Sequence, residues 1–277
     1  MRLGPRLVLV IFFLGLITGS VFGTENLSNF GDTGYFNLPS VEILPDRGMG
    51  ANYSNFLLSS DEFDIMVNNV NLVKAFSSRL QASVNMGIMN FSSEKTLGYS
   101  LPPKDLGVNN LSFNFKYLFN KNLKNSPSHV YYGLGCMFNA APSDNVTQDV
   151  KNILNVLFQG MGEPSFIPMP YIVYGSVTST GSLTLYVKVK GGLGIGGGYR
   201  QRVFKKFELV IEALSMLYNV TEVKLDKKMY TLGICYPIGE HAKISAAFNF
   251  MKISFEGSFE QFESRFIYPS INMTVLY

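Results

Sequence analysis

Apolar and polar residues alternate along several separate segments of this chain. Leu111, Phe113 and Phe115 alternate with Ser112 and Asn114. The same period of two recurs in residues 80–88, 183–190, 230–236, 242–250 and 270–277. Because successive side chains of a strand point to opposite faces, each segment predicts a strand with one apolar face. One such strand fits any half-buried sheet, but this many favour a barrel with an apolar and a polar surface.

We therefore predict an all-β fold, a single antiparallel transmembrane β-barrel of about 12 strands. The expected strands lie near residues 48–57, 63–75, 79–91, 106–120, 128–140, 166–179, 182–190, 193–203, 207–217, 227–238, 242–253 and 265–277. Alternation is poor in the second and sixth of these segments. A phase slip around Asn68, Asn69 and Val70 predicts a bulge in the second.

The connections alternate in length, which is typical of barrels with short periplasmic turns and longer outer loops. Short turns are expected at residues 77–78, 180–181, 205–206 and 240–241, and long connections at residues 92–105, 141–165, 218–226 and 254–264. This order predicts a periplasmic N-terminus. Only the connection at Gly191 and Gly192 is short where a long one is due, and strand parity predicts a three-residue turn at residues 191–193.

One helix is expected in the longest outer loop, at residues 146–160. Asp144 or Asn145 is a candidate cap, and the residues at helical spacing there are Val150, Ile153, Leu154, Leu157 and Phe158. The helix either packs over the mouth of the barrel or folds into the lumen as a constriction.

The last strand predicts where the protein is located. Its apolar positions end on an aromatic residue and are Ile271, Met273, Val275 and Tyr277. A closing strand of this kind resembles the C-terminal signal that the barrel-assembly machinery of the bacterial outer membrane reads. An open edge ending in this way would invite aggregation. We therefore expect outer-membrane lipid and the assembly machinery as partners.

The N-terminal residues read as a signal peptide. Arg2 and Arg6 precede an apolar run at residues 7–16, which is shorter than the roughly 20 residues of a membrane-spanning helix. We expect cleavage after Gly23, with an uncleaved anchor as the alternative. The expected organisation is a signal peptide (residues 1–23), a periplasmic segment (residues 24–47) and a barrel (residues 48–277) in the outer membrane of a diderm bacterium.

Composition favours a membrane barrel. The chain is 47% hydrophobic and only 16% charged, against about 25% charged residues in ordinary soluble domains. The 23 Phe and 15 Tyr suit a lipid-facing surface and its interfacial girdles. A formal charge of +3 without a basic cluster argues against a nucleic-acid partner.

Candidate catalytic chemistry is sparse. His129 and His241 are the only histidines, and neither has a Ser and an acid at a spacing that predicts a triad. We expect no enzyme activity, no metal site and no cofactor. Cys136 and Cys235 are expected to be free thiols in separate strands. The glycine-rich residues 191–198 lack a phosphate-binding pattern and are interpreted as a bend in the barrel.

Residues 31–58 resemble the start of a known barrel group. They are similar to the exopolysaccharide-associated outer-membrane barrels (the YjbH-like group), whose barrels begin with a Gly-x-x-Gly, a Pro-Ser/Thr pair, an acidic residue and Gly. The matching positions are Gly31, Gly34, Pro39, Ser40, Asp46 and Gly48. Arg47 between the acidic residue and Gly48 departs from that pattern. The resemblance implies an accessory role in surface-polysaccharide production, and the segment is expected either along the periplasmic rim or inside the lumen.

Charged residues on the predicted inner face carry the remaining chemical signal. They are Lys116, Lys188, Lys190, Arg200, Arg202 and Lys243, with the acids Glu208 and Glu212. One interpretation is a solvated lumen with salt bridges; the other is a basic pore that attracts anions, in which Lys188, Lys190, Arg200 and Arg202 matter most.

The sequence leaves the function open among three classes. The first is a small pore for hydrophilic solutes, anions included. The second is a non-catalytic accessory to polysaccharide export, and the third is a structural barrel filled by side chains.

Overall fold

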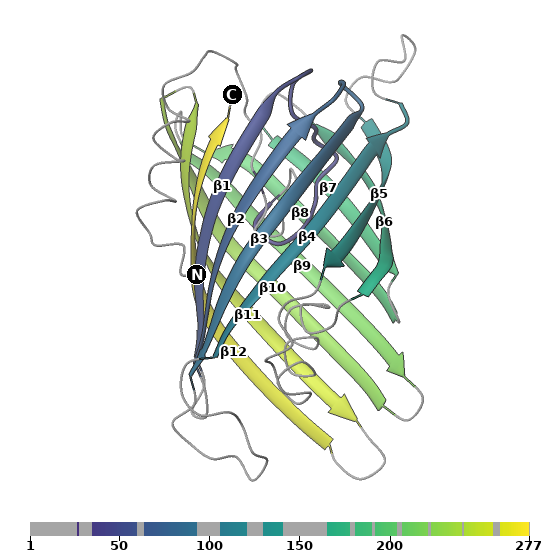
Figure 1. Cartoon of the computed structure of the whole chain (residues 1–277), viewed down its shortest axis with the longest axis vertical. Coiled ribbons are helices and arrows are strands. Elements are labelled where there is room, and N and C mark those ends of the chain that lie inside the picture. Colours follow the sequence, from purple (N-terminus) through teal and green to yellow (C-terminus); the bar gives the residue numbers. More distant parts are fainter. Residues whose placement is uncertain are drawn as a thin grey trace.

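A computed structural model describes residue 27 and residues 35–59, 64–92, 106–120, 130–140, 165–177, 181–189, 192–203, 207–220, 223–239, 241–256 and 261–276. These residues form one closed antiparallel barrel of 12 strands (Figure 1). The strands are β1 (Met49–Ser59), β2 (Asp64–Ala75), β3 (Leu80–Ser92), β4 (Leu106–Leu118), β5 (Val130–Ala140), β6 (Ser165–Val177), β7 (Gly181–Val189), β8 (Gly192–Val203), β9 (Phe207–Val220), β10 (Val223–Ile238), β11 (Ala242–Glu256) and β12 (Gln261–Leu276). The predicted fold class is confirmed.

The last strand closes the barrel against the first. Gly50 lies opposite Leu276, and the register continues to Phe56 opposite Ser270. Every strand therefore has a hydrogen-bonded neighbour on both sides, and the sheet has no open edge. Ile271 and Met273 are exposed and Val275 is buried. The assembly signal that ends at Tyr277 stays a prediction, because Tyr277 lies outside the described residues.

Side chains are apolar on the outside of the barrel and largely polar on the inside. On β11, Phe248 exposes 69% of its surface, whereas its neighbour Asn249 exposes 1%. Ile244 is exposed next to the buried Lys243 and Ser245. This is the reverse of a soluble domain and is typical of barrels that cross a membrane.

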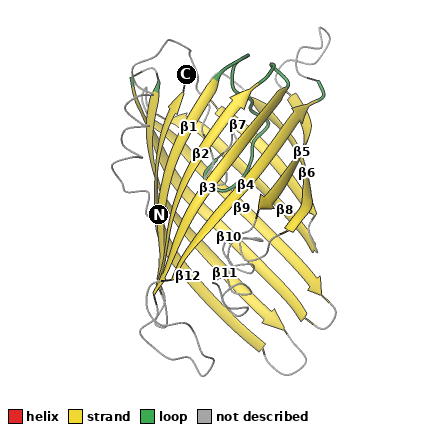
Figure 2. Cartoon of the chain, in the orientation of Figure 1, coloured by secondary structure: helices red, strands yellow, loops and turns green. Residues whose placement is uncertain are grey.

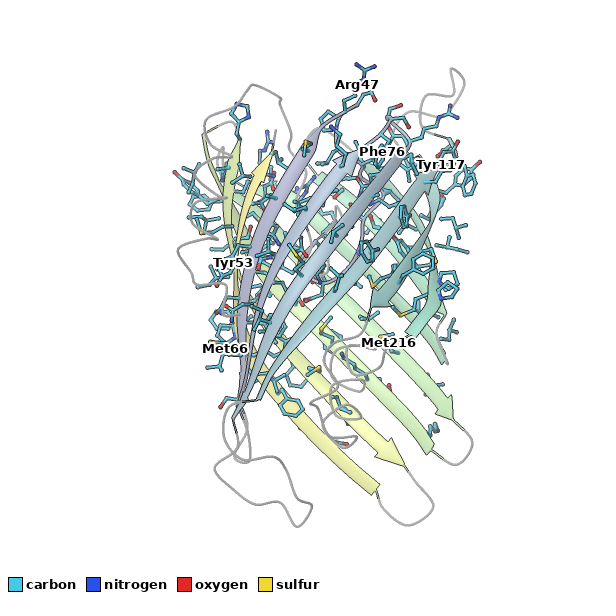
Figure 3. All side chains as sticks on the ribbon, viewed as in Figure 1. Arg47, Tyr53, Met66, Phe76, Tyr117 and Met216 are labelled. Carbon is cyan, nitrogen blue, oxygen red and sulfur yellow. The ribbon has the colours of Figure 1, made fainter. Side chains whose placement is uncertain are left out.

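An aromatic group marks one end of the outer surface. Phe119 packs between Tyr117 and Tyr132, with ring centroids 5.5 and 5.8 Å apart. All three rings are exposed, as is Phe76 in the turn between β2 and β3. Phe76 and Tyr117 lie at the end of the barrel where β1 begins (Figure 3). Aromatic girdles lie at membrane–water interfaces, so one boundary of the membrane is expected at this end.

The bulge predicted in β2 is wrong. The register of β2 with β1 runs without a shift from Lys74 opposite Met49 to Asp64 opposite Ser59. The alternation slips because Asn68 faces outward, where its side-chain oxygen accepts hydrogen bonds from the Tyr53 hydroxyl and the Asn55 amide. The prediction assigns polar residues to the inner face, but these hydrogen bonds stabilise a polar side chain on the outer face.

Two further irregularities have identifiable causes. The register shift that the described residues do contain lies between β5 and β6, at Met137 and Asn139. β6 alternates poorly in sequence because its inward positions are themselves apolar: Tyr171 and Val173 belong to the buried cluster inside the barrel.

The turn between β7 and β8 has the predicted odd length at a different place. Val189 lies opposite Leu193, so residues 190–192 separate the last pair rather than residues 191–193. The helix expected at residues 146–160 lies outside the described residues. Among the described residues, no helix is long and apolar enough to cross a membrane.

If the outward apolar surface faces lipid, a charge placed on it should destabilise the barrel more near the middle of a strand than at its end. Leu232, near the middle of β10, and Ile238, at its end, are both exposed. Replacing Leu232 by Arg should lower the free energy of unfolding in lipid vesicles by about 2–4 kcal/mol, and Ile238→Arg by only about 0–1 kcal/mol, because a charge near the interface stays hydrated. Urea unfolding of both variants measures this. Equal losses would show that β10 does not sit across a bilayer as described.

Candidate functional site

A segment that precedes β1 lies inside the barrel. Residues 35–44 lie in the lumen, as the green loop within the strands of Figure 2 shows, and the turn at residues 45–48 then leads into β1. We call residues 35–44 the plug. Its apolar side chains expose at most 2% of their surface and belong to one cluster with residues of the wall: Tyr35, Phe36, Leu38, Val41, Ile43 and Leu44. Of the two placements expected from the sequence, rim or lumen, the structure has the lumen.

Glycines of the wall make room for the rings of the plug. A side chain on Gly198 of β8 would collide with the Tyr35 ring, and one on Gly233 of β10 would collide with the Phe36 ring. A Cβ on Gly196 would lie 3.2 Å from Leu38 Cδ1. Gly196 and Gly198 belong to the glycine-rich residues 191–198, where the sequence predicts a bend, and contact with the plug is an observed reason for glycine there. Only glycine at these inward positions lets the plug approach the strand backbone.

Glu212 of β9 is the main polar anchor of the plug. The backbone N–H of Asn37 donates to Glu212 Oε1 over 2.9 Å, and the N–H of Leu38 donates to the same oxygen over 3.1 Å. The Asn37 side-chain nitrogen lies 3.0 Å from Thr231 Oγ1 and 2.9 Å from Asn249 Oδ1. One carboxylate therefore satisfies two backbone donors of a buried loop, which has no ladder of its own.

Tyr35 and Val41 bind β7 at a second anchor. The Tyr35 hydroxyl donates to Thr184 Oγ1 over 3.1 Å and lies 3.3 Å from Ser182 Oγ. The backbone N–H of Val41 donates to the same Thr184 oxygen over 3.3 Å. Burial, and after it the Glu42 carboxylate, raises the pKa of Tyr35 above its ordinary value.

Charged side chains meet where the plug crosses β8, β9 and β11. Glu42 of the plug forms an ion pair with Arg200. Glu208 lies 3.9 Å from Arg200 and 3.3 Å from Lys243. All four side chains are at most 9% exposed. Buried charges of opposite sign thus neutralise one another, as burial requires.

Lys116 binds the other side of the plug. Its ammonium group donates to the backbone carbonyl of Ser40 over 2.9 Å. Ser40 in turn donates through Oγ to Glu42 over 3.3 Å, and accepts from the Glu42 N–H over 3.1 Å. A lysine expected to line an open pore is therefore part of the plug's attachment.

The residues predicted to line a pore fall into three groups. Lys116, Arg200, Lys243, Glu208 and Glu212 are buried on the inner face and contact the plug or its ion pairs. Arg202 is exposed near the end of β8. The Lys188 side chain and the whole of Lys190 lie outside the described residues. The pore-lining role of the whole set stays a prediction.

Sequence analysis did not single out Asn37, Glu42 or the buried Lys227 of β10. Glu42 carried a usable signal, since a lone acid between Val41 and Ile43 in an apolar segment requires a partner. Asn37 carried none, because its partners lie on three other strands, β9, β10 and β11.

Within residues 31–58, which resemble the YjbH-like group, residues 35–44 form the plug, residues 45–48 the turn, and residues 49–58 part of β1. The Gly48 N–H donates to the Pro45 carbonyl over 2.8 Å, which closes a turn. Arg47 has a φ of 62°, the left-handed region that favours glycine. Pro39 and Ser40 belong to the plug, and Asp46 is exposed in the turn. Gly31 and Gly34 lie outside the described residues.

The described residues contain no group of three potential metal ligands. Cys136 and Cys235 are both free, as predicted, with Cys235 buried on the inner face and Cys136 half-buried. His241 stands in the turn between β10 and β11, and His129 lies outside the described residues.

Comparison with known proteins identifies the fold. No protein-family model matches the chain, and no curated protein matches its sequence. The COG4313 outer membrane channel from Pseudomonas putida F1 has a TM-score of 0.59 at 10% identity, over 87% of this chain and 99% of that one. KdgM porin, alone and in complex with disordered oligogalacturonate, has a TM-score of 0.51 at 11% identity, over 82% of this chain and 98% of that one. At these identities the likeness concerns the barrel fold alone.

The Glu42–Arg200 ion pair can be tested by reversing the charge of each residue in turn. Arg200→Glu places a carboxylate between Glu42 and Glu208, and breaking a buried pair in this way costs about 3–5 kcal/mol. The plug should leave its site, so that the amides of Asn37 and Leu38 exchange hydrogen much faster, as mass spectrometry of the plug peptide would measure. Adding Glu42→Arg restores opposite charges and should restore protection. Fast exchange in the double variant would contradict the role of this pair.

Proposed function

We propose that this protein is an outer-membrane barrel of a diderm bacterium that conducts small hydrophilic solutes, and that the plug closes the lumen in the conformation described. The observation that carries the proposal is the polar inner wall. Its buried side chains include Arg200, Glu208 and Glu212, which a barrel that needed only to be filled would not require. A barrel of 12 strands lies between those filled by side chains, at about eight strands, and the open porins, at about 16–18 strands.

The chemistry of the plug supports a closed state that can open. Its polar anchors are hydrogen bonds and ion pairs to Glu212, Thr184 and Arg200. Water can replace each of these contacts once the plug moves, because every anchor group is itself polar or charged. The channel architecture of the neighbouring folds supports the same assignment.

A structural, non-conducting barrel is the second candidate. The near-complete burial of Tyr35, Phe36 and Leu38 favours it, since apolar surface released from the cluster would meet water. An accessory role in surface-polysaccharide export rests on the resemblance of residues 31–58. None of these candidate functions includes catalysis.

Processing and assembly belong to the same proposal. Residues 1–23 are the signal peptide, cut after Gly23, and the barrel-assembly machinery inserts the mature chain into outer-membrane lipid. Support for both comes from the sequence patterns at the two ends of the chain.

Conductance in planar lipid bilayers separates the channel from the filled barrel. Gly198→Val adds a side chain where the Tyr35 ring lies, so the plug should be displaced and the conductance should rise well above that of the parent. Gly197→Val is the matched control: it stands one residue away on the opposite face, and its Cβ would lie 3.2 Å from the nearest atom, Thr184 O. No conductance from Gly198→Val, in a protein that is folded, would favour the filled barrel.

The ion preference of the channel tests whether positively charged residues of the lumen attract anions. Arg200 and Lys243 are paired with acids, and Lys116 binds the backbone of the plug. Lys188, Lys190 and Arg202 are the remaining basic residues of the predicted set. Replacing Lys188 and Arg202 by Glu in the conducting variant should shift the reversal potential toward cations, because fixed negative charge concentrates counter-ions in a narrow path. An unchanged reversal potential would remove these residues from the conduction path.

A further inference from the structure

The inner wall of the barrel has a charged side and an uncharged side. The buried charged side chains of the strands stand on β4 and on β8 to β11: Lys116, Arg200, Glu208, Glu212, Lys227 and Lys243. On β12, β1, β2 and β3, the described inward positions carry no charge. Their buried polar residues are serines, a threonine, asparagines and a glutamine: Asn52, Ser54, Asn69, Asn71, Gln81, Ser83, Asn85, Ser270, Asn272 and Thr274.

Part of this uncharged side has no hydrogen-bond partner. Ser54 Oγ, Asn272 Oδ1 and both side-chain polar atoms of Asn69 and Asn85 are buried without a donor or acceptor, within the part of the chain that the structure describes. The four residues expose 0%, 3%, 0% and 1% of their surface, respectively. Buried polar groups without partners are rare in folded proteins, and each one calls for an explanation such as strain, a bound water or ion, or a functional role.

The strand register brings these residues together. Ser54 of β1 lies opposite Asn272 of β12 on one side and opposite Asn69 of β2 on the other. Asn85 of β3 faces the position two residues beyond Asn69 and is therefore its diagonal neighbour. Directly opposite residues of antiparallel strands have Cβ atoms about 5 Å apart, so the four side chains form one continuous surface. We call it the amide patch.

The plug is anchored mainly on strands away from the amide patch. Its hydrogen bonds and ion pair go to Thr184, Arg200, Glu212, Thr231 and Asn249, on β7 to β11. Near the turn it also accepts from Lys116 of β4, and the Leu44 N–H donates to Gln81 Oε1 of β3 over 3.4 Å. The four residues of the amide patch are not among these partners. The unpaired groups of the amide patch therefore destabilise the plugged conformation, because a buried polar group without a partner has lost its hydrogen bonds to water. A polar solute that reached this wall would recover that free energy.

An aromatic pair borders the patch on the side away from the plug turn. Phe56 of β1 and Tyr268 of β12 have ring centroids 5.5 Å apart, and both face inward. Phe56 is two residues beyond Ser54, and Tyr268 is four before Asn272, so both rings continue the same wall. Aromatic faces pack against the C–H faces of sugar rings, while amides donate to and accept from sugar hydroxyls.

We propose that the amide patch, with Phe56 and Tyr268, is a binding site for uncharged, polyhydroxylated solutes of the saccharide class. The inference rests on the proposed function, because a solute reaches the patch only when the plug has moved. It specifies the class of solute. The charged side of the wall binds the plug, and the uncharged side binds the solute. Amides suit neutral hydroxyl groups because they offer donors and acceptors without the desolvation cost of a buried charge.

The test measures binding of maltohexaose to the detergent-solubilised full-length protein by saturation-transfer NMR. The parent, Gly198→Val and Arg200→Glu are compared, since the last two release the plug by different means. Saturable binding is expected in the released variants. In the same background, Asn69→Leu with Asn85→Leu should raise the half-saturating concentration about tenfold or more, because several hydrogen bonds to the solute are lost.

Asn68→Leu is the matched control, since Asn68 is the neighbouring residue on the outer face of β2 and bonds Tyr53 and Asn55 there. It should leave maltohexaose binding unchanged. A stability readout separates binding from a structural role. Removing unpaired amides should leave the urea midpoint of Asn69→Leu/Asn85→Leu equal to the parent's or higher, whereas a structural role predicts a lower one.

Three results would overturn the proposal: no maltohexaose binding in the parent or either released variant, equal binding by Asn69→Leu/Asn85→Leu, or tighter binding of the anionic trigalacturonate than of maltohexaose. Conductance of the same variants distinguishes this failure from failure of the channel. Conductance without saccharide binding contradicts the amide patch alone. Saccharide binding without conductance supports the patch and contradicts the channel.

Discussion

Closure of β1 against β12 is the constraint on which the rest of this structure depends. Backbone groups in a hydrocarbon layer have no water to bind, so a sheet that crosses it has to pair every strand on both sides. The register from Gly50 opposite Leu276 to Phe56 opposite Ser270 meets that requirement. Closure also sends alternate side chains of every strand into one enclosed space. The polar residues of the chain gather there because the outside faces lipid.

That enclosed space is wider than the inward side chains can fill, and the chain fills it with its own N-terminal segment. Two kinds of contact hold the plug. The rings of Tyr35 and Phe36 pack over glycines, where apolar surface is removed from water. Glu212 and Thr184 bind backbone N–H groups that a buried loop would otherwise leave unpaired. The plug supplies Glu42 to Arg200 as well, so its charge complements that of the wall.

The contacts of the plug are distributed unevenly around the barrel. Strands β7 to β11 provide the deep anchors, together with Lys116 of β4 nearer the turn. The four residues of the amide patch, on β12, β1, β2 and β3, are not among these anchors, and they hold buried polar atoms without a hydrogen-bond partner. The plugged conformation is thus stabilised by hydrogen bonds and ion pairs on β7 to β11, and destabilised by unpaired buried groups on β12 and β1 to β3. Such an imbalance reduces the free-energy gap to a conformation in which the patch is solvated or occupied.

The strands were predictable from the sequence because alternation is a local property, which each segment displays without knowledge of its neighbours. The same rule failed at Asn68, where a hydrogen bond to Asn55 stabilises a polar side chain on the outer face. It was also uninformative in β6, whose inward Tyr171 and Val173 pack against the plug cluster. In both cases the polarity of the side chain matches the residues that it contacts, and it does not indicate whether the side chain points into or out of the barrel.

The sequence by itself determined the barrel, its closing strand and the inward direction of residues such as Arg200 and Glu212. Only the tertiary structure decided what these residues bind. Glu42 and Arg200 are 158 positions apart, and Asn37 and Asn249 are 212 apart. No periodic pattern links residues so distant, because a plug has no register with the strands around it. Its position follows from shape and charge, from two glycines that admit two rings and a carboxylate that meets two N–H groups, and these come together only once the barrel has closed.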